Sequence, residues 1–429
     1  MTILIKGGEL VDPVQNIVER KDIIIEGDRI LKILSPDEYR EQDTKLKIID
    51  ASGKIIMPGL IDMHVHLREP GHEYKETIST GGKSGAAGGF TGLACMPNTE
   101  PVNDKRSVTE FILRQARKAD LLKVYPIAAI TKGLKGETLT EFGDLRDAGA
   151  VGVSDDGLPV LNSEVMRRAM EYAEYHDLAI ISHCEDTSLS ARGVMHEGVV
   201  SAQISLSGIP SASEEVMVRR EISLARLTGL PVHIAHVSTA GSVQVIRRAK
   251  EDGVPVTAET APHYFSLDHN AVTKYSTNAK MNPPLRGPED VKAIKQGLKE
   301  GVLDVIATDH APHSPLEKDV EFDKAAFGII GLETALPLTL ALVRQGILTL
   351  PVAVGKLTCN PASIIGVNGG SIEEGVAADL AIVDPECEYV LSKDDLLSKS
   401  KNSPFIGKRL KGRNTLTMVD GRIVWERYA

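Results

Sequence analysis

Two histidines spaced two residues apart give the first sign of chemistry in this chain. His64 and His66 stand at the end of an apolar run, Leu60 to Val65, that has the length and composition of a buried strand. Because residues two apart on a strand point to the same side, both imidazoles can face one ion, and imidazole is a common zinc ligand. A single pair of this kind can equally consist of packing or solvent-facing histidines, so other residues must decide.

Four further apolar runs also end in histidine or aspartate. Each ending places these residues where a strand of a parallel barrel would finish, and barrel active sites lie at that face. Four histidines and two aspartates that converge there predict a metal centre. The endings are Ser154-Asp155-Asp156-Gly157, Ser182-His183-Cys184-Glu185-Asp186, Ala235-His236-Val237-Ser238 and Ala307-Thr308-Asp309-His310-Ala311-Pro312-His313.

The predicted centre suits two metal ions better than one. Asp155 and Asp156 are neighbours after the fourth apolar run, so they face opposite ways, and only one of them is expected to bridge two ions. The residues alone leave open which of the two does so. The other expected ligands are His64, His66 and Asp309 for one ion, and His183 and His236 for the other.

Other polar residues near these strand ends are expected to serve the structure. Cys184 follows His183 and should therefore point away from the metals, as a buried thiol. His233, three residues before His236, should face the other side of its strand. Glu185 is expected to accept hydrogen bonds rather than to bind metal.

The elements that must hold this centre form a repeating pattern in the middle of the chain. Eight short apolar runs alternate with stretches of helical periodicity, such as 163–176 and 213–228. Eight such strand–helix units predict a (β/α)8 barrel, whose parallel strands all end at one face. The runs are Leu60 to Val65, Gly92 to Met96, Val124 to Ile130, Val151 to Val153, Ala179 to Ser182, Val232 to Ala235, Val254 to Ala258 and Asp304 to Ala307.

Both ends of the chain have a different pattern, of short strands joined by turns. We predict that residues 1–55 and 366–429 build one small β-sandwich domain, and that residues 56–365 form the catalytic barrel. Ser314 to Lys324, a charged stretch after the eighth run, is expected to be an exposed loop.

The composition excludes several classes of function. The length of 429 residues suits one large barrel with an appendage. A net charge of −10 argues against nucleic-acid binding, and an anionic ligand would need local positive charge from metal or arginine. No apolar run approaches the ~20 residues that span a bilayer. The four cysteines are scattered without a CxxC pair, which predicts reduced thiols and a cytoplasmic setting.

Four motifs place these residues in a familiar pattern. They are Asp62-Met63-His64-Val65-His66-Leu67-Arg68-Glu69-Pro70-Gly71, Met96-Pro97-Asn98-Thr99, Asn282-Pro283-Pro284-Leu285-Arg286 and Thr308-Asp309-His310-Ala311-Pro312-His313. With them the chain resembles, over essentially its whole length, the dihydroorotases of the bacterial class I type within the amidohydrolase superfamily. That resemblance also implies the split β-sandwich built from both termini.

The resemblance implies a ligand set and a group of substrate contacts. It selects Asp156 as the bridging carboxylate; many members of the superfamily use a carboxylated lysine, but no lysine lies near the end of the fourth run. The implied metal ligands are His64, His66, Asp156, His183, His236 and Asp309. The implied substrate contacts are His66, Arg68, Asn98, Asn282, His313 and the backbone of Phe327 and Gly328.

The reaction implied by the resemblance is the reversible, zinc-dependent opening of (S)-dihydroorotate to N-carbamoyl-L-aspartate, which in reverse closes the ring in pyrimidine biosynthesis. We expect one or two zinc ions per chain, and two in particular. Asp309 is expected to be ligand, base and acid, taking a proton from the nucleophile and passing it to the departing nitrogen. Arg68 is expected to bind the substrate carboxylate, because a guanidinium fork suits that group.

Two other kinds of function are compatible with these residues. One is a different cyclic amidohydrolase, such as a dihydropyrimidinase, hydantoinase or allantoinase, whose rings do not call for Arg68 together with Asn98. The other is a scaffold for aspartate carbamoyltransferase, a role that some dihydroorotase-like chains take after losing their ligands. All six ligands are present here, so we do not expect a purely structural role. An active enzyme that also binds this transferase, or that forms a homo-oligomer, is compatible with the sequence.

Overall fold

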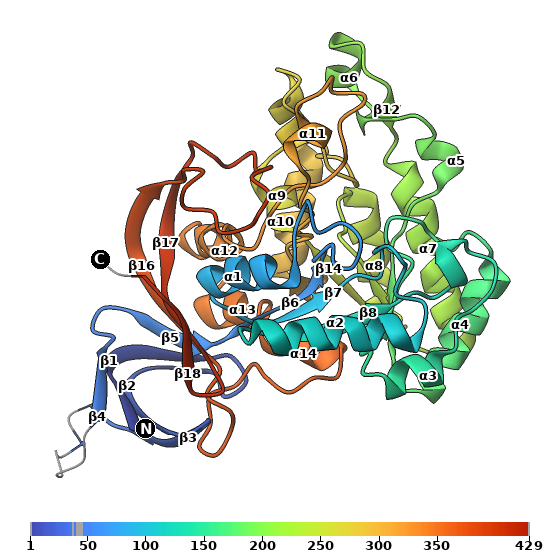
Figure 1. Cartoon of the computed structure of the whole chain (residues 1–429). Helices are drawn as coiled ribbons and strands as arrows, with labels where there is room; N and C mark the ends of the chain where they lie inside the picture. Colours follow the sequence, from blue (N-terminus) through green and yellow to red (C-terminus); the bar gives the residue numbers. More distant parts are fainter. Residues whose placement is uncertain (1, 37, 40–45, 428–429) are drawn as a thin grey trace.

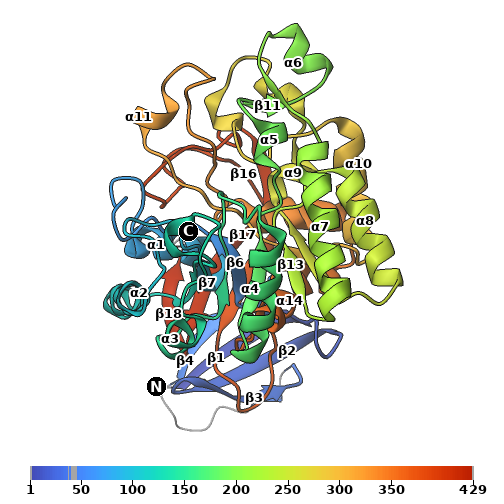
Figure 2. The same ribbon diagram turned by 90° about the vertical axis from the view of Figure 1, so that its right-hand side faces the viewer.

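A computed structural model describes residues 2–36, 38–39 and 46–427. Its centre is a sheet of eight parallel strands in the order β15-β14-β13-β10-β9-β8-β7-β6, which Figures 1 and 2 show from two directions. This confirms the predicted fold class of a (β/α)8 barrel. The strands are β6 (Leu60–Val65), β7 (Phe90–Cys95), β8 (Lys123–Ala128), β9 (Gly152–Val153), β10 (Ala179–Ser182), β13 (Val232–Ile234), β14 (Val256–Thr260) and β15 (Val305–Ile306).

Helices follow the strands in turn and cover the outside of the barrel. Every residue of β6 and β7 is buried, as expected for strands enclosed on both faces. Among the described residues, no helix is long and apolar enough to cross a membrane. The helices are α1 (Ile78–Gly88), α2 (Arg106–Ala119), α3 (Phe142–Asp147), α4 (Ser163–Tyr175), α7 (Ala212–Thr228), α8 (Ala240–Glu251), α10 (Pro288–Lys299) and α12 (Ala335–Arg344), with α13 (Leu350–Gly355) and α14 (Cys359–Ile364) after them.

The first and last strands of the barrel meet through bonds at their carboxyl ends. The backbone N–H of His66 donates to the carbonyl of His310 over 2.8 Å. The carboxylate of Asp62 accepts the N–H of His64 at 3.0 Å and that of Thr308 at 3.2 Å. Asp62 is fully buried. One side chain therefore ties the end of β6 to the residues that follow β15, beside the predicted ligands.

Both termini contribute to a second sheet, in the order β18-β17-β16-β5-β1-β2-β3, with β4 paired to β1. β5 joins the two halves, because it runs parallel to β1 and antiparallel to β16. This sheet bears out the predicted sandwich from both ends, while the exact boundaries at residues 55 and 366 stay predictions. The strands are β1 (Thr2–Asp12), β2 (Ile17–Glu26), β3 (Arg29–Leu34), β4 (Leu46–Asp50), β5 (Ile55–Pro58), β16 (Leu380–Val390), β17 (Arg409–Val419) and β18 (Arg422–Glu426).

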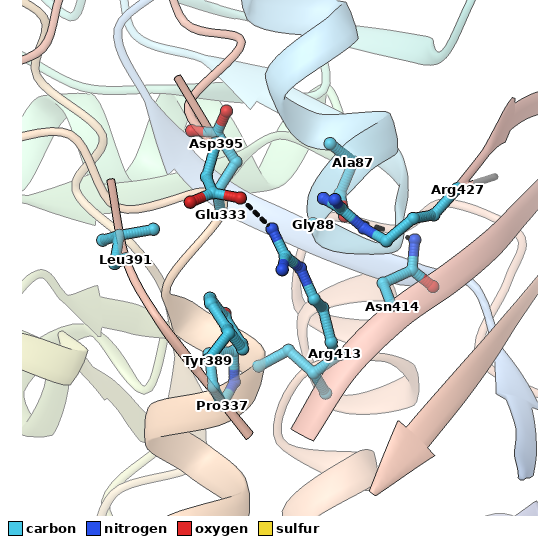
Figure 3. Close-up of a pocket in the computed structure, with 11 residues that line it drawn as sticks. Ala87, Gly88, Glu333, Pro337, Tyr389, Leu391, Asp395, Arg413, Asn414 and Arg427 are labelled. Atoms are coloured by element: carbon cyan, nitrogen blue, oxygen red, sulfur yellow. Dashed lines mark hydrogen bonds and ion pairs between the residues drawn. The ribbon is translucent and has the colours of Figure 1, made fainter. Parts of the chain in front are cut away.

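Polar side chains of β17 fix the terminal sheet against the barrel helices. Arg413 pairs with Asp395 and stacks on Tyr389, with 4.0 Å between the guanidinium carbon and the ring centre. The side chain of Asn414 donates to the carbonyls of Ala86 at 3.2 Å and Ala87 at 3.3 Å, at the end of α1. Figure 3 shows Arg413, Asp395, Tyr389, Asn414 and Ala87, which surround a hollow of about 20 Å³. A space of that size holds about one water molecule, so we regard this junction as structural.

The loops at the mouth of the barrel are more structured than the sequence suggests. Ser314 to Lys324 contains the short helix α11 (Pro315–Lys318), and Lys318 and Phe322 are buried. The expectation of an exposed loop is therefore wrong for these two side chains and for Ser314, which is 6% exposed, although Leu316 is 86% exposed. A second excursion, which stands above the barrel in Figure 2, consists of α5 (Thr187–Ser190), β11 (Met195–His196), α6 (Val199–Gln203) and β12 (Gly208–Ile209).

Replacement of Asp62 tests the closure of the barrel. Asp62→Ala leaves two buried N–H groups without an acceptor, at about 1–3 kcal/mol each, so it is expected to lower the free energy of unfolding by about 2–6 kcal/mol. Asp62→Asn retains an acceptor oxygen and is expected to cost less. Urea unfolding of the three proteins measures the difference. A midpoint for Asp62→Ala equal to that of the wild type would show that the closure does not depend on this side chain.

Candidate metal centre and active site

All six predicted ligands lie at the carboxyl ends of barrel strands and are buried. They come from the ends of β6, β9, β10, β13 and β15, and their exposed fractions run from 0% to 7%. The strand pattern explains this arrangement, because parallel strands deliver their last side chains to one face. The residues that the structure brings together are His64, His66, Asp156, His183, His236 and Asp309.

Asp156 lies among the four imidazoles. Its Oδ1 is 3.3 Å from His64 Nε2, 3.6 Å from His183 Nδ1 and 3.4 Å from His236 Nε2. Its Oδ2 is 3.5 Å from His66 Nε2. One carboxylate therefore faces both groups of histidines, which is the position that a bridging ligand requires.

Asp155 points the other way, toward the loop after β8. Its carboxylate accepts the N–H of Thr131 at 3.0 Å and also bonds to the Thr131 hydroxyl. Burial raises the pKa of Asp155 to about 6, and the bonds to Thr131 oppose that rise. The two neighbouring aspartates thus divide their tasks: one faces the imidazoles and the other holds a loop.

The donor atoms fit divalent metal ions. Two groups of three ligands share Asp156, and the atoms of each group lie within 4.8 Å of one another. Four ligands placed tetrahedrally about 2.0–2.2 Å from an ion lie about 3.3–3.6 Å apart, which matches the separations around Asp156. His64 Nε2 and Asp156 Oδ1 are also buried without a hydrogen-bond partner. Such atoms are satisfied if each binds metal. The two groups are His64, His66 and Asp156, and Asp156, His183 and His236.

The charge of the cluster also suits a divalent metal ion. Burial alone would lower the pKa of His183, but Asp156 and Glu185 outweigh it and raise that pKa to about 10. The carboxylates thus demand positive charge at this position, and a metal ion supplies it without protonating the ring. His183 Nε2 lies 2.9 Å from Glu185 Oε2, so Nδ1, which faces His236 Nε2 at 2.8 Å and Asp156, is the nitrogen that could bind an ion. Glu185 acts as a hydrogen-bond acceptor, as its position in the sequence suggested.

Asp309 lies beside the candidate ligands His64 and His66 and lines the cavity. Its Oδ1 is 3.2 Å from His66 Nε2 and 3.8 Å from His64 Nε2. Its φ is +49°, and His236 (+33°) and Arg68 (+61°) are also left-handed. Such a conformation costs about 1–2 kcal/mol for a residue with a side chain, and it persists where surrounding contacts impose it, often at functional sites.

Glu259, on β14, was not singled out from the sequence. Its Oε1 is 2.5 Å from His64 Nδ1, and its Oε2 is 3.3 Å from His233 Nε2. A carboxylate that holds one imidazole nitrogen fixes the tautomer and leaves the other nitrogen for metal. His233 points behind the ligands toward Glu259, in agreement with the expectation that it faces away from the metals. The signal available was an acidic residue directly after the seventh apolar run, Val254 to Ala258.

A cavity of about 240 Å³ opens over the cluster. It is large enough for a small ring and is polar on the metal side. All the predicted substrate contacts line it together with ligands of both groups. Its walls include His66, Arg68, Asn98, Asp156, Gly157, His183, His236, Asn282, Asp309, Ala311, His313, Phe327 and Gly328.

Arg68 reaches this cavity through a turn and not along a strand. β6 ends at Val65, so the strand does not extend to Arg68. The Nε of Arg68 donates to the carbonyl of Pro312 at 3.2 Å, and its Nη2 is 3.3 Å from His313 Nε2. Burial and the charge of Arg68 lower the pKa of His313 to about 3, so this imidazole is neutral at pH 7 and accepts the guanidinium proton.

The charge of Arg68 lacks a carboxylate at ion-pair distance in the described part of the chain, and Asp309 and Glu317 act on it only from farther away. Among residues 2–36, 38–39 and 46–427 it forms no ion pair within 4.0 Å, although it is only 9% exposed. Glu69 and Glu73, which are close to Arg68 in the sequence, instead accept the N–H groups of Ile78 and Gly71. Arg68 therefore offers a buried positive charge to a ligand in the cavity.

Two amides complete the predicted contacts. Asn98 Oδ1 lies 2.8 Å from His66 Nδ1, so it holds this ligand from the side opposite the metal cluster. The amide of Asn282 donates to Glu185 at 2.8 Å, and Glu185 holds His183. Both amides therefore line the cavity and also orient the histidines.

The fold and the site define an amidohydrolase with a barrel and a histidine–aspartate cluster that can bind metal. Residues 53–242 match the family described as Dihydro-orotase-like. The dihydroorotase of Geobacter metallireducens is 53% identical over all of both chains, and that of Syntrophus aciditrophicus is 51% identical over 99% of this chain and all of its own. The chain belongs to the dihydroorotase family and is thus a hydrolase of cyclic amides.

Solved structures share the architecture. The L-hydantoinase (dihydropyrimidinase) of Arthrobacter aurescens superposes with a TM-score of 0.87 at 25% identity, over 99% of this chain and 96% of its own. The dihydropyrimidinase of Brevibacillus agri gives a TM-score of 0.86 at 23% identity, over 99% and 95% of the two chains. The second likeness concerns the fold alone.

Replacement of Glu259 tests its support of the metal ligands. Glu259→Gln keeps the shape but weakens the acceptor for His64, so we expect metal affinity to fall about 10- to 100-fold. Competition with a chelator measures it. Asp155→Asn is the matched control, because Asp155 is also a buried carboxylate but contacts no imidazole; its metal affinity should stay close to that of the wild type. Equal affinities for both variants would contradict the role of Glu259.

Proposed function

We propose that this chain catalyses the reversible opening of (S)-dihydroorotate to N-carbamoyl-L-aspartate, the activity in the name of its relatives. The observation that carries the proposal is the unpaired guanidinium of Arg68 in the cavity wall. A buried charge is costly unless it is paired. Dihydroorotate carries a carboxylate on its ring, and that group is a suitable partner for Arg68.

The proposed metal is zinc, with two ions per chain. Imidazole nitrogens and carboxylate oxygens are suitable donors for zinc. Zinc, when bound, lowers the pKa of water to about 7 and polarises a carbonyl group. One ion would be held by His64, His66 and Asp309, the other by His183 and His236, with Asp156 between them.

In this proposal Asp309 moves the proton. Burial alone would raise the pKa of Asp309, but the hydrogen bond from His66 and the nearby imidazoles outweigh it and lower that pKa. The carboxylate is therefore ionised at neutral pH and can accept a proton from the water molecule that attacks the ring carbonyl. It then donates that proton to the ring nitrogen as the amide bond breaks. Ring closure takes the same path in reverse.

The remaining wall residues would orient the ring. Arg68, supported by the neutral His313 and by Asn98, would bind the carboxylate on one side of the cavity. Asn282 and the backbone of Phe327 and Gly328 would bind the ring amides on the other side. Holding the ring in this way would bring the carbonyl that is attacked to the candidate metal ligands. It would also reduce the entropy that is lost on reaching the transition state.

Hydantoinase or dihydropyrimidinase activity is the second candidate, favoured by the likeness to the Arthrobacter aurescens enzyme. Those neutral rings offer no carboxylate to Arg68, so we place them second. Association with aspartate carbamoyltransferase, a homo-oligomer and a cytoplasmic location stay predictions. The four cysteines are unpaired, as a reducing setting would have them.

A direct assay tests the proposed reaction. Purified protein is expected to interconvert dihydroorotate and N-carbamoyl-aspartate and to hold one or two zinc ions per chain. Asp309→Asn removes a ligand charge and the proton carrier, and acid–base catalysis alone contributes ~10²–10⁴-fold. We therefore expect activity near background in both directions. A variant within about tenfold of the wild type would mean that another group carries the proton.

Replacement of Arg68 tests the choice of substrate. Leaving the substrate carboxylate desolvated and unpaired costs ~2–5 kcal/mol, so Arg68→Met should lower kcat/KM for dihydroorotate roughly 30- to 4,000-fold. Dihydrouracil lacks that carboxylate, and its low turnover should change little. Arg68→Lys keeps the charge without the fork and should fall between. Equal losses for the two rings would mean that Arg68 serves the structure and not the recognition of the substrate.

A further inference from the structure

The segment between β16 and β17 crosses from the terminal sheet to the mouth of the barrel, and Figure 1 shows it in dark red above these two strands. Alternate residues of this segment are buried and bonded to barrel loops. Ser398 Oγ bonds to Glu76 Oε2 at 2.5 Å, and Ser400 Oγ donates to the carbonyl of Lys75 at 2.7 Å. Both partners lie in the loop after β6. Asn402 is the next residue in this alternation and is 4% exposed.

Asn402 uses its side-chain amide to join two separate pieces of the cavity wall. Its Nδ2 donates to the carbonyls of Ala311 and Gly328, each at 3.0 Å. Its Oδ1 accepts the N–H of His313 at 3.1 Å. Two carbonyls at one end and an N–H at the other fix the orientation of the amide, because only its nitrogen can donate. Its backbone carbonyl accepts the N–H of Ile330 at 3.0 Å.

The three groups that Asn402 holds belong to residues that line the cavity. Ala311 and His313 follow β15, whereas Gly328 comes after α11. The two pieces approach closely: a Cβ on Gly328, whose φ is +132°, would lie 2.7 Å from Ala311 Cβ and 3.1 Å from His313 Cδ2. A small change in their separation would therefore move His313 and the backbone of Gly328 together.

We propose that Asn402 is a positioning residue for substrate recognition. It sets the spacing between His313, which supports Arg68, and the backbone at Gly328, and so fixes the width of the cavity. It touches none of the six metal ligands through its side chain, since its bonds go to Ala311, His313 and Gly328. Asn402 thus acts on substrate affinity and leaves the metal cluster unchanged. The substrate named in its test rests on the proposed function.

Asn402→Asp is the sharpest variant, because it has the same shape but turns a carboxylate oxygen toward two carbonyl oxygens. Two hydrogen bonds are lost, so we expect KM for dihydroorotate to rise roughly tenfold or more. The kcat and the zinc content should stay close to those of the wild type. If Asn402→Asp fails to fold, Asn402→Ala serves in its place, because it removes the amide without introducing charge repulsion. We expect the same rise in KM for Asn402→Ala.

Asn414→Asp is the matched control. Asn414 is also a buried asparagine of the C-terminal part, 3% exposed, and also donates to two carbonyls, those of Ala86 and Ala87. It lies at the junction with α1, away from the cavity. We expect the control to lower the melting temperature with KM unchanged. A rise in KM equal in both variants, or a parallel loss of zinc and kcat in Asn402→Asp, would overturn the positioning role.

Hydrogen exchange gives a readout that does not depend on the substrate. In Asn402→Asp, the carbonyls of Ala311 and Gly328 lose their donor, while the N–H of His313 keeps an acceptor. The wall around Ala311 and Gly328 should therefore loosen, and the amides of Ala311 and of residues 328–330 should exchange faster. The same amides in Asn414→Asp should exchange as in the wild type. Unchanged exchange in Asn402→Asp would contradict the inference. A wild-type protein that fails to turn over dihydroorotate would refute the proposed reaction instead, without altering this comparison.

Discussion

The arrangement at the barrel mouth depends on one buried carboxylate. Asp156 lies within 3.6 Å of imidazole nitrogens from three different strands. Removing such a charge from water costs several kcal/mol unless opposite charge and hydrogen bonds replace the lost hydration. The six ligands, Glu259 behind them and Glu185 beside them together form a cluster with excess negative charge. A divalent cation would balance this charge, and the barrel supplies the rigid frame that keeps like charges together.

The barrel provides this frame at a cost in backbone conformation. Arg68, His236 and Asp309, in the segments after their strands, all have left-handed backbone conformations, which free chains rarely adopt. Hydrogen bonds hold two of these residues in place. Arg68 bonds to Pro312 and His313, and Asp309 bonds to His66. The bonds of Asp62 across the seam between first and last strands keep these positions in register. The packing of the barrel thus offsets the conformational free energy that these three residues cost, and it keeps their side chains at the cavity.

Features that depend on local periodicity could be predicted from the sequence. Eight apolar runs separated by helical stretches indicated the barrel. The strand ends indicated the four histidines, Asp309 and one residue of the pair Asp155 and Asp156, whereas the choice of Asp156 came from the family resemblance. Glu259 was not singled out, although it directly follows the apolar run Val254 to Ala258 and thus stands at a strand end like the predicted ligands. Asn402 could not be predicted: its partners lie 74 to 91 residues away, in irregular segments without any periodicity. Contacts of that kind are set by the tertiary path of the chain.

The position of Asn402 also bears on the order in which the chain is synthesised. All six candidate ligands lie between residues 64 and 309, so they emerge from the ribosome well before the segment that braces the cavity. The terminal sheet also cannot form until late in synthesis, because β5 is synthesised early and its partner β16 late. Domains fold largely as units from the N-terminal side during synthesis. A nascent barrel can therefore assemble its metal ligands first, while a complete substrate cavity requires nearly the whole polypeptide.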